Sequence, residues 1–118
     1  MNVRDELLLK KIVMFCDRIA DNLERCSGYE NFLKDLMCQD ACCMCVVQIG
    51  ELVAFLSDDV KEANIGVPWK IIKDTRNFYV HKYGAIEVDS LWETLCNDIP
   101  VLKKNCEEIL TNKDSCRK

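Results

Sequence analysis

The chain is short of several features that would define a function outright. Its 118 residues include one histidine, two prolines and four glycines. No uninterrupted apolar run approaches the roughly 18 residues that a membrane-spanning helix needs. The first residues, MNVRDELLLKK, carry acids where a secretory signal carries bases. We therefore expect a protein with no membrane segment that resides in the cytoplasm.

The chain also lacks an excess of positive charge. It has 20 acidic and 16 basic residues, and its formal net charge is -4. Such a chain repels a polyanion at long range, so any nucleic-acid site must be a local patch. The hydrophobic content of 49% is enough for one core. We predict a single domain over residues 1–112 and a frayed polar tail over residues 113–118.

Cysteine is the one residue type in clear excess, with nine copies. The number is odd and no export signal is present, which favours a reducing compartment over a disulfide framework. Cys42, Cys43 and Cys45 lack the second well-spaced pair that a zinc site needs. Cys38, Cys42 and Cys45 are spaced by four and then three residues, which makes one stripe on a helix. We therefore predict small buried hydrophobes, with no metal and no cofactor.

Apolar spacing predicts helices in the first half of the chain. A first amphipathic helix covers about residues 3–25 and is interrupted at Ser27 and Gly28. A short helix is expected over 29–36. The next helix, about 38–55, is apolar nearly all round, so we expect other helices or a partner subunit to surround it.

The second half begins with a connector over residues 60–66, with at most one short turn of helix. Pro68 suits the first turn of a helix, where its missing N–H costs nothing, and this helix is expected to end at Tyr83. Gly84 is its predicted C-terminal cap.

The last helix is expected to be capped by Asp89 or Ser90. Its apolar side comprises Leu91, Leu95, Ile99, Leu102, Cys106 and Ile109. Pro100 lies inside this pattern and should kink or split the helix. Because no alternating apolar and polar run indicates a strand, we predict an all-α, up-and-down bundle of four to five helices.

The helix that starts at Pro68 has two distinct faces. On a wheel of about 100° per residue, one arc faces the core. It comprises Ile71, Ile72, Thr75, Phe78 and Tyr79. The other arc spans about 140° and gathers bases, an amide and the only imidazole. It comprises Lys70, Lys73, Arg76, Asn77 and His81.

This second arc suits phosphate chemistry. Arg76 can bind two phosphate oxygens at once and is always charged. An imidazole titrates near pH 6.5, so His81 can take the proton of a ribose 2′-hydroxyl or give one to a leaving 5′-oxygen. Asn77 can orient the phosphate or the imidazole, and Lys70 and Lys73 are candidate RNA-binding residues. No step of this reaction needs a metal.

Helical geometry adds a condition to this site. Arg76 and His81 are five residues apart and point about 140° away from each other, so one copy cannot aim both at one atom. Two copies packed face to face bring four such groups into one cleft. The same arc can equally be an ordinary solvated face or a surface for an acidic protein partner.

The residues from Arg76 to Tyr83, RNFYVHKY, resemble the signature of the HEPN superfamily, and specifically its HepT-like toxin branch. In that signature an arginine, commonly followed by asparagine, precedes a histidine and then a tyrosine. Three flanking runs are also similar to the family: IGE at 49–51, VPW at 67–69 and VDSLWETLCNDIPVL at 88–102. The resemblance covers about residues 29–105.

The resemblance implies a homodimeric HEPN-like bundle and a metal-independent endoribonuclease toxin of a type II or type VII-like toxin–antitoxin system. Arg76 and His81 would lie at the dimer cleft. It also implies an antitoxin partner, a small nucleotidyltransferase of the MNT type, which in some systems attaches AMP to the motif tyrosine, here Tyr83. The wheel places Tyr83 within about 20° of Arg76, so a nucleotide there would block the phosphate site.

The chain departs from the family pattern in the residues KDT before Arg76 and in its cysteine-rich central helix. Similar bundles serve without catalysis as substrate-binding or docking subunits of nucleotidyltransferases. This is our alternative hypothesis for the function. In a third reading the basic arc binds nucleic acid without cleaving it, and Trp69 and Tyr79 stack on bases if they are not core residues.

Overall fold

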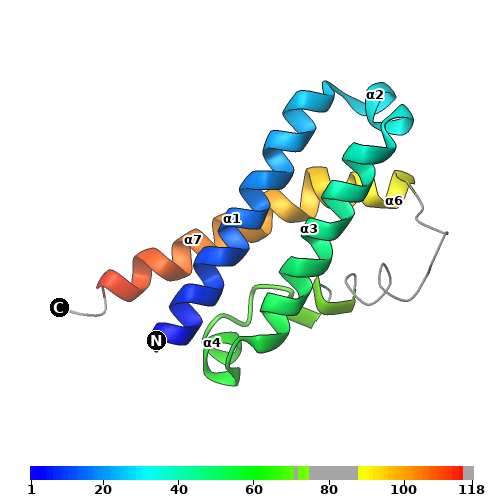
Figure 1. Ribbon diagram of the computed structural model, residues 1–118. Coiled ribbons are helices and arrows are strands. Elements are labelled where there is room, and N and C mark those ends of the chain that lie inside the picture. The colour runs from blue at the N-terminus through cyan, green and yellow to red at the C-terminus, as the bar shows by residue number, and fades with distance from the viewer. Residues whose placement is uncertain (71, 75–87, 116–118) are drawn as a thin grey trace.

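The structure is a computed structural model that describes residues 1–70, 72–74 and 88–115, and in these ranges the chain forms helices and no strand (Figure 1). The elements are α1 (Val3–Cys26), α2 (Tyr29–Lys34), α3 (Leu36–Phe55), α4 (Asp58–Ala63), α6 (Val88–Glu93), η1 (Thr94–Asp98) and α7 (Ile99–Ser115). The predicted all-α class is confirmed.

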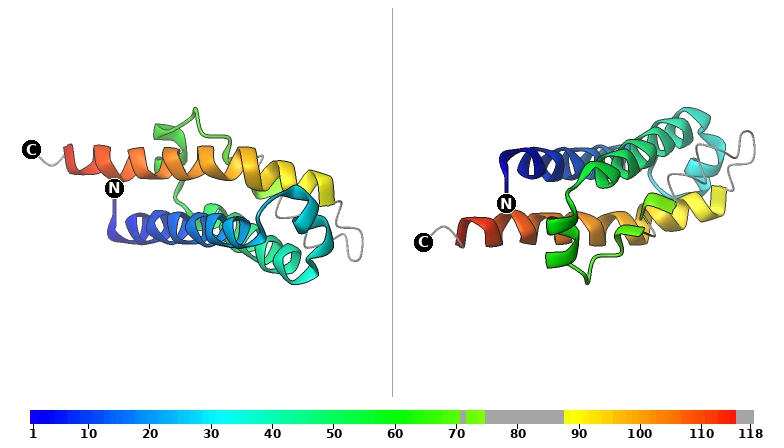
Figure 2. Two further views of the ribbon diagram at one scale, coloured as in Figure 1. Left: turned by 90° about the horizontal axis from the view of Figure 1, so that it is seen from above. Right: turned by 90° about the horizontal axis from the view of Figure 1, so that it is seen from below.

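The helices are arranged in two layers. Helices α1 and α3 lie side by side and run in opposite directions, while α6, η1 and α7 form a rod across the back of both (Figure 2). The core lies between the layers. Its fully buried members include Leu9, Ile12, Ile19, Ile49, Val53, Leu91, Leu95 and Leu102.

Helix α1 begins and ends at local signals in its sequence. The side chain of Asn2 accepts a hydrogen bond from the backbone N–H of Asp5 at 2.7 Å, which satisfies a free donor of the first turn. At the other end Ser27 adopts a left-handed conformation with φ of 62° and its N–H donates to Leu23. Gly28 follows with φ of 109°, so the predicted interruption is confirmed.

Helix α3 starts earlier than its apolar pattern predicted. The side chain of Asp35 accepts a hydrogen bond from the N–H of Cys38 at 3.0 Å and so caps a helix whose first residue is Leu36. Helix α2 therefore ends at Lys34, before the expected boundary at residue 36. The capping role of Asp35 was not read from the sequence.

The stretch expected as a connector contains a helix of its own. Ser57 caps α4 by accepting from the N–H of Val60 at 3.3 Å. The same serine is tied to α1, because its N–H and its hydroxyl both donate to the carboxylate of Asp5, at 3.0 and 2.7 Å. Asp5 is only 2% exposed. This contact fixes the start of α4 against the start of α1.

Pro100 was predicted to kink or split the last helix, and the structure shows a change of helix type just before it. Between Glu93 and Ile99 the chain forms a π-helical segment, η1, in which the N–H of Ile99 donates to the carbonyl of Thr94. The flanking residues keep helical dihedral angles, so the rod stays continuous. Proline would clash with the carbonyl four residues earlier in a regular α-helix. The wider turn just before Pro100 accommodates the ring without a break.

Seven of the described cysteines are buried and form no disulfide: Cys16, Cys26, Cys38, Cys42, Cys43, Cys45 and Cys106. The eighth, Cys96, is exposed. Burial raises the pKa of Cys16 and of Cys106 to about 12, and raises the pKa of Cys42 as well. The prediction of small buried hydrophobes is confirmed for these seven cysteines and is wrong for Cys96.

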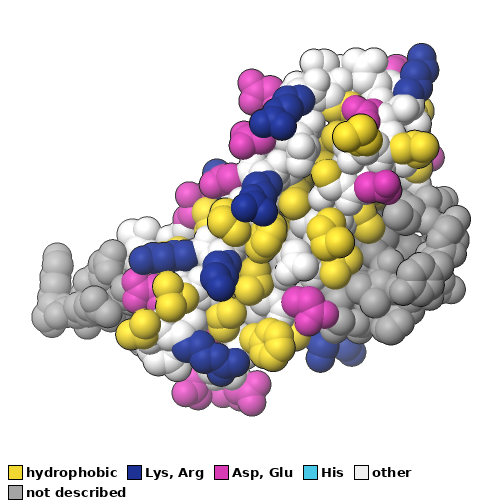
Figure 3. Space-filling model, viewed as in Figure 1, with side chains coloured by type: hydrophobic (Ala, Val, Ile, Leu, Met, Phe, Trp, Pro, Cys, Tyr) yellow, Lys and Arg dark blue, Asp and Glu magenta, His cyan; other side chains and the backbone are white. Residues whose placement is uncertain are grey.

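Helix α3 is covered on one side only. By length and composition it is apolar enough to cross a bilayer, but half of its apolar stretch is buried in the protein. A core helix passes the same test. On its outer side Met37, Met44 and Phe55 are exposed by 84%, 57% and 56%. Figure 3 shows apolar side chains along this face of α1 and α3.

Candidate functional site

Most of the predicted site lies outside the described residues. This holds for Arg76, Asn77, His81 and Tyr83, and also for the predicted cap Gly84. Lys70 and Lys73 are the predicted site residues that the structure describes. The described residues on either side of 75–87 are each tied to the bundle by contacts of their own.

The upstream end is held by a buried tryptophan. Trp69 is 8% exposed, and its indole N–H donates to the carbonyl of Asn64 at 3.2 Å. Its backbone N–H donates to Val67 at 2.8 Å, and the N–H of Ile72 donates to Pro68 at 3.2 Å, which starts the helix at the proline as predicted. Trp69 is therefore a core residue and not a platform for base stacking.

Lys70 and Lys73 are both exposed on the helical residues that follow. They are three residues apart, so their side chains share one side of the helix. Asp74 is exposed as well and lies one turn after Lys70 on the same side. The carboxylate of Asp74 thus borders the basic arc and lowers its local potential, a feature that our reading of the sequence missed.

The downstream end is held by an aromatic cluster and a carboxylate. The hydroxyl of Tyr29 in α2 donates to the carboxylate of Asp89 in α6, and this hydrogen bond raises the pKa of the tyrosine. The ring of Trp92 packs edge-on against Tyr29, with centroids 5.5 Å apart, and against Phe32 at 5.0 Å. The prediction that Asp89 or Ser90 caps this helix is wrong, because both lie inside α6 and Asp89 binds a side chain instead.

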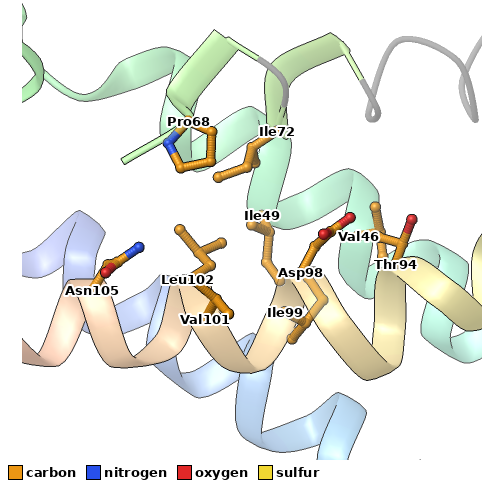
Figure 4. A pocket seen from close by; sticks show the side chains of 10 residues that line it. All are labelled: Val46, Ile49, Pro68, Ile72, Thr94, Asp98, Ile99, Val101, Leu102 and Asn105. Atoms are coloured by element: carbon orange, nitrogen blue, oxygen red, sulfur yellow. The ribbon is translucent and has the colours of Figure 1, made fainter. Parts of the chain in front are cut away.

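A cavity of about 180 Å³ lies beside the upstream anchor (Figure 4). Its described lining consists of Val46, Ile49, Pro68, Ile72, Thr94, Asp98, Ile99, Val101, Leu102 and Asn105. The side chains of Ile49, Ile72 and Leu102 converge in it, so its wall is apolar. The one charged group in that lining is the carboxylate of Asp98, which would repel a phosphate. This cavity does not suit the anion that the predicted chemistry needs.

Neither the cavity nor the aromatic anchor was found from the sequence. One half of the aromatic anchor, Asp89 and Trp92, lies in a sequence run that was already noted. The residues that contact it, Tyr29 and Phe32, lie about 60 positions earlier in the chain, so the sequence did not show the pairing. The cavity depends on the π-helical turn, which brings Thr94 and Asp98 to its edge.

The chain is similar in sequence to known proteins over most of its length. The family model described as Ribonuclease HepT-like matches residues 12–109. A protein of Caldanaerobacter subterraneus, provisionally named an RNase, is 32% identical over 86% of this chain and 90% of its own length. A protein of Thermococcus cleftensis named "Probable ribonuclease HepT" is 32% identical over 69% of this chain and 74% of its own length. No solved structure matches. The chain belongs to the ribonuclease HepT-like family of the HEPN superfamily.

Proposed function

We propose that this chain is a metal-independent endoribonuclease that acts as the toxin of a toxin–antitoxin pair in the cytoplasm. Its active site is a cleft shared by two copies. The observation that carries the proposal is the family match over residues 12–109, which includes the whole stretch from Arg76 to Tyr83. The anchors at Trp69 and Asp89 support it, because they tie the described residues before and after that segment to the bundle.

The reaction is an in-line displacement at phosphorus. The 2′-oxygen of the ribose attacks, the bond from phosphorus to the 5′-oxygen breaks, and a 2′,3′-cyclic phosphate and a 5′-hydroxyl result. His81 of one copy takes the 2′-hydroxyl proton, and His81 of the other copy gives a proton to the leaving oxygen. Arg76 binds the phosphate oxygens and offsets the charge that develops there, and Asn77 orients the phosphate.

Lys70 and Lys73 extend this site along the RNA backbone. Both side chains are exposed and share a side of the helix that leads into the motif. Two phosphate contacts per copy predict a salt dependence of RNA binding with a slope of about -0.7 for each contact to a single strand. The carboxylate of Asp74 lies beside the two lysines and offsets part of their charge. The attraction between the lysines and the RNA phosphates therefore acts only at short range.

Regulation by a partner enzyme follows from the same motif. A nucleotidyltransferase antitoxin of the MNT type would transfer AMP from ATP to Tyr83. The phenol oxygen bonds to the α-phosphorus, pyrophosphate leaves, and the phenol proton passes to solvent. The product places a negative phosphodiester close to Arg76, where it competes with RNA for the guanidinium.

The test uses the purified chain, free of partner and in excess chelator, with a single-stranded RNA. We expect cleavage that leaves cyclic phosphate ends, and at least a 100-fold slower rate for His81→Ala and Arg76→Ala. Lys104→Ala, an exposed change on α7, is the matched control and should cut at the parent rate. Equal rates for His81→Ala and the parent would reject the proposal and favour the docking-subunit alternative, in which the chain expressed alone does not slow bacterial growth.

A further inference from the structure

The outer face of α1 and α3, on the side away from α7, exposes large apolar side chains (Figures 2 and 3). On α1 these are Leu7 and Met14, which are 53% and 40% exposed. On α3 they are Met37, Met44 and Phe55, each more than half exposed. We call this surface the α1/α3 face. A contiguous apolar surface of this kind marks an interaction site more often than a free surface.

A row of bases follows α1 on this face. Arg4, Lys11, Arg18 and Arg25 are all exposed and recur at seven-residue intervals. Seven residues are nearly two helical turns, about 10.5 Å, so the four side chains share one side of the helix. The guanidinium of Arg18 lies 5.1 Å from the centre of the Phe15 ring, which keeps this charge close to the apolar surface.

Acids occupy the two ends of α3. Asp35 and Asp40 lie at its start, and Asp58 and Asp59 follow its end; all four are exposed. Between these ends the exposed side chain of Met44 is apolar. Helix α3 therefore has exposed carboxylates at both ends, and its outer side between them carries Met44, Gln48 and the partly exposed Glu51.

At one end of the face Arg4 and Asp58 lie at the same level. Asp5, the neighbour of Arg4, accepts two hydrogen bonds from Ser57, the neighbour of Asp58. Because α1 and α3 run in opposite directions, the start of one meets the end of the other here (Figure 1).

At the other end Arg25 lies at the level of Asp35. The thiol of Cys38 donates to the carbonyl of Asn22 at 3.7 Å, and in antiparallel helices the residue three after Asn22 lies opposite the residue three before Cys38. Each end of the face thus pairs a base on α1 with an acid next to α3.

We propose that the α1/α3 face binds a second copy of this chain about a two-fold axis parallel to the two helices. This axis places α1 of each copy over α3 of the other. Arg4 then faces Asp58 of the other copy, Arg25 faces Asp35, and the exposed apolar side chains of the two copies meet. A two-fold axis perpendicular to the helices would instead place α1 of one copy over α1 of the other. The basic side chains of the two copies would then repel each other, so the charges favour the first arrangement.

The size of the face agrees with a stable pair. Helix α1 has 24 residues. At about 1.5 Å per residue it is about 36 Å long, and two helices side by side are about 20 Å wide. The face therefore covers about 700 Å² per copy, or about 1,400 Å² in total, which is within the range of specific interfaces.

This pairing does not rest on the proposed function, whose two-fold axis involves the helix that starts at Pro68. If both axes exist, the chain assembles as a dimer of dimers. An RNA or an anionic membrane would also meet bases on this face. Neither would gain from the acids at the ends of α3, which a second copy uses.

The test is a charge exchange measured by sedimentation equilibrium. Arg4→Glu with Arg25→Glu gives one variant, and Asp35→Lys with Asp58→Lys gives the other. Each variant alone should have about half the mass of the parent assembly, because like charges meet in its own pair. Mixed in equal amounts, the two should recover the parent mass, since α1 of either variant then meets opposite charges on its partner.

Circular dichroism would check that each variant is folded, and Lys104→Glu on α7 is the matched control, with the parent mass. Met44→Asp, midway along α3, should halve the mass of the assembly. Mixing this variant with either charge variant should not restore the parent mass. The proposal is overturned if the charge variants keep the parent mass, or if their mixture stays at half of it. RNA cleavage is measured separately, so a failed pairing and a failed ribonuclease can be told apart.

Discussion

The contact between Asp5 and Ser57 gives the sharpest stability prediction. These residues are 52 positions apart in the chain, and the contact joins the first turn of α1 to the start of α4. We consider Asp5→Ala, Ser57→Ala and the double variant. Asp5→Ala removes the acceptor of both hydrogen bonds, whereas Ser57→Ala removes the hydroxyl and leaves the backbone N–H bonded to Asp5.

The magnitude follows from what each change removes. A hydrogen bond to a charged group contributes about 1.5–3 kcal/mol, so the loss of both should lower the free energy of unfolding by about 3–5 kcal/mol. Ser57→Ala loses one such bond and the cap of α4, together about 2–4 kcal/mol. The bond that both variants lack is the one from the hydroxyl to Asp5, at 2.7 Å. The coupling energy should therefore be about 1.5 kcal/mol or more.

Urea unfolding of the four proteins gives the cycle, and each kcal/mol should also shift the Tm by about 4 °C in a chain of this size. Asp35→Ala is the control, because Asp35 caps α3 in the same way but has no contact with Asp5. Combined with Asp5→Ala it should be additive to within about 0.5 kcal/mol. A coupling below that value between Asp5 and Ser57 would refute the role we assign to this contact.

Three further predictions follow from burial and charge. Phe32→Ala should lower the free energy of unfolding by about 3–5 kcal/mol in urea, because the ring is fully buried; a loss under about 1 kcal/mol would contradict this. The pKa values of Cys16 and Cys106, about 12 against an ordinary 9.0, predict stability that is fully present below pH 9 and is lost toward pH 12. The loss should be about 1.4 kcal/mol per pH unit for each thiol, and smaller by one thiol in Cys106→Ala. Lys70→Glu with Lys73→Glu should slow RNA cleavage about 10-fold at low salt and less at high salt, with the urea midpoint unchanged.

The helices were predictable where periodicity and local signals agree. Ser27 and Gly28 mark the end of α1, and the apolar spacing gives its buried side. Asp5 shows the limit of such signals. As an acid in the first turn it has a sufficient local explanation in the helix dipole, yet its tertiary partner Ser57 decides its burial.

The candidate site was predicted less completely, for a related reason. The wheel that grouped Lys70 and Lys73 was drawn from the bases, and it left out Asp74, which the same geometry places next to Lys70. Asp89 looked like a cap because capping is local, whereas its partner Tyr29 is a long-range one. Local patterns supply candidates for each role, and tertiary contacts decide between them.

The contacts of Trp69 and Asp89 bear on the geometry that the proposed shared site requires. Catalysis by a shared site requires that groups from two copies converge to within a fraction of an ångström. The described residues before the motif are tied to Asn64 through Trp69, and those after it are tied to α2 through Asp89 and Trp92. Asn64 follows α4 and α2 precedes α3, so both ties involve elements that neighbour α3 in the chain. The buried cysteines of α3 contribute to the packing of this framework without adding reactive thiolates, because burial keeps their pKa values raised.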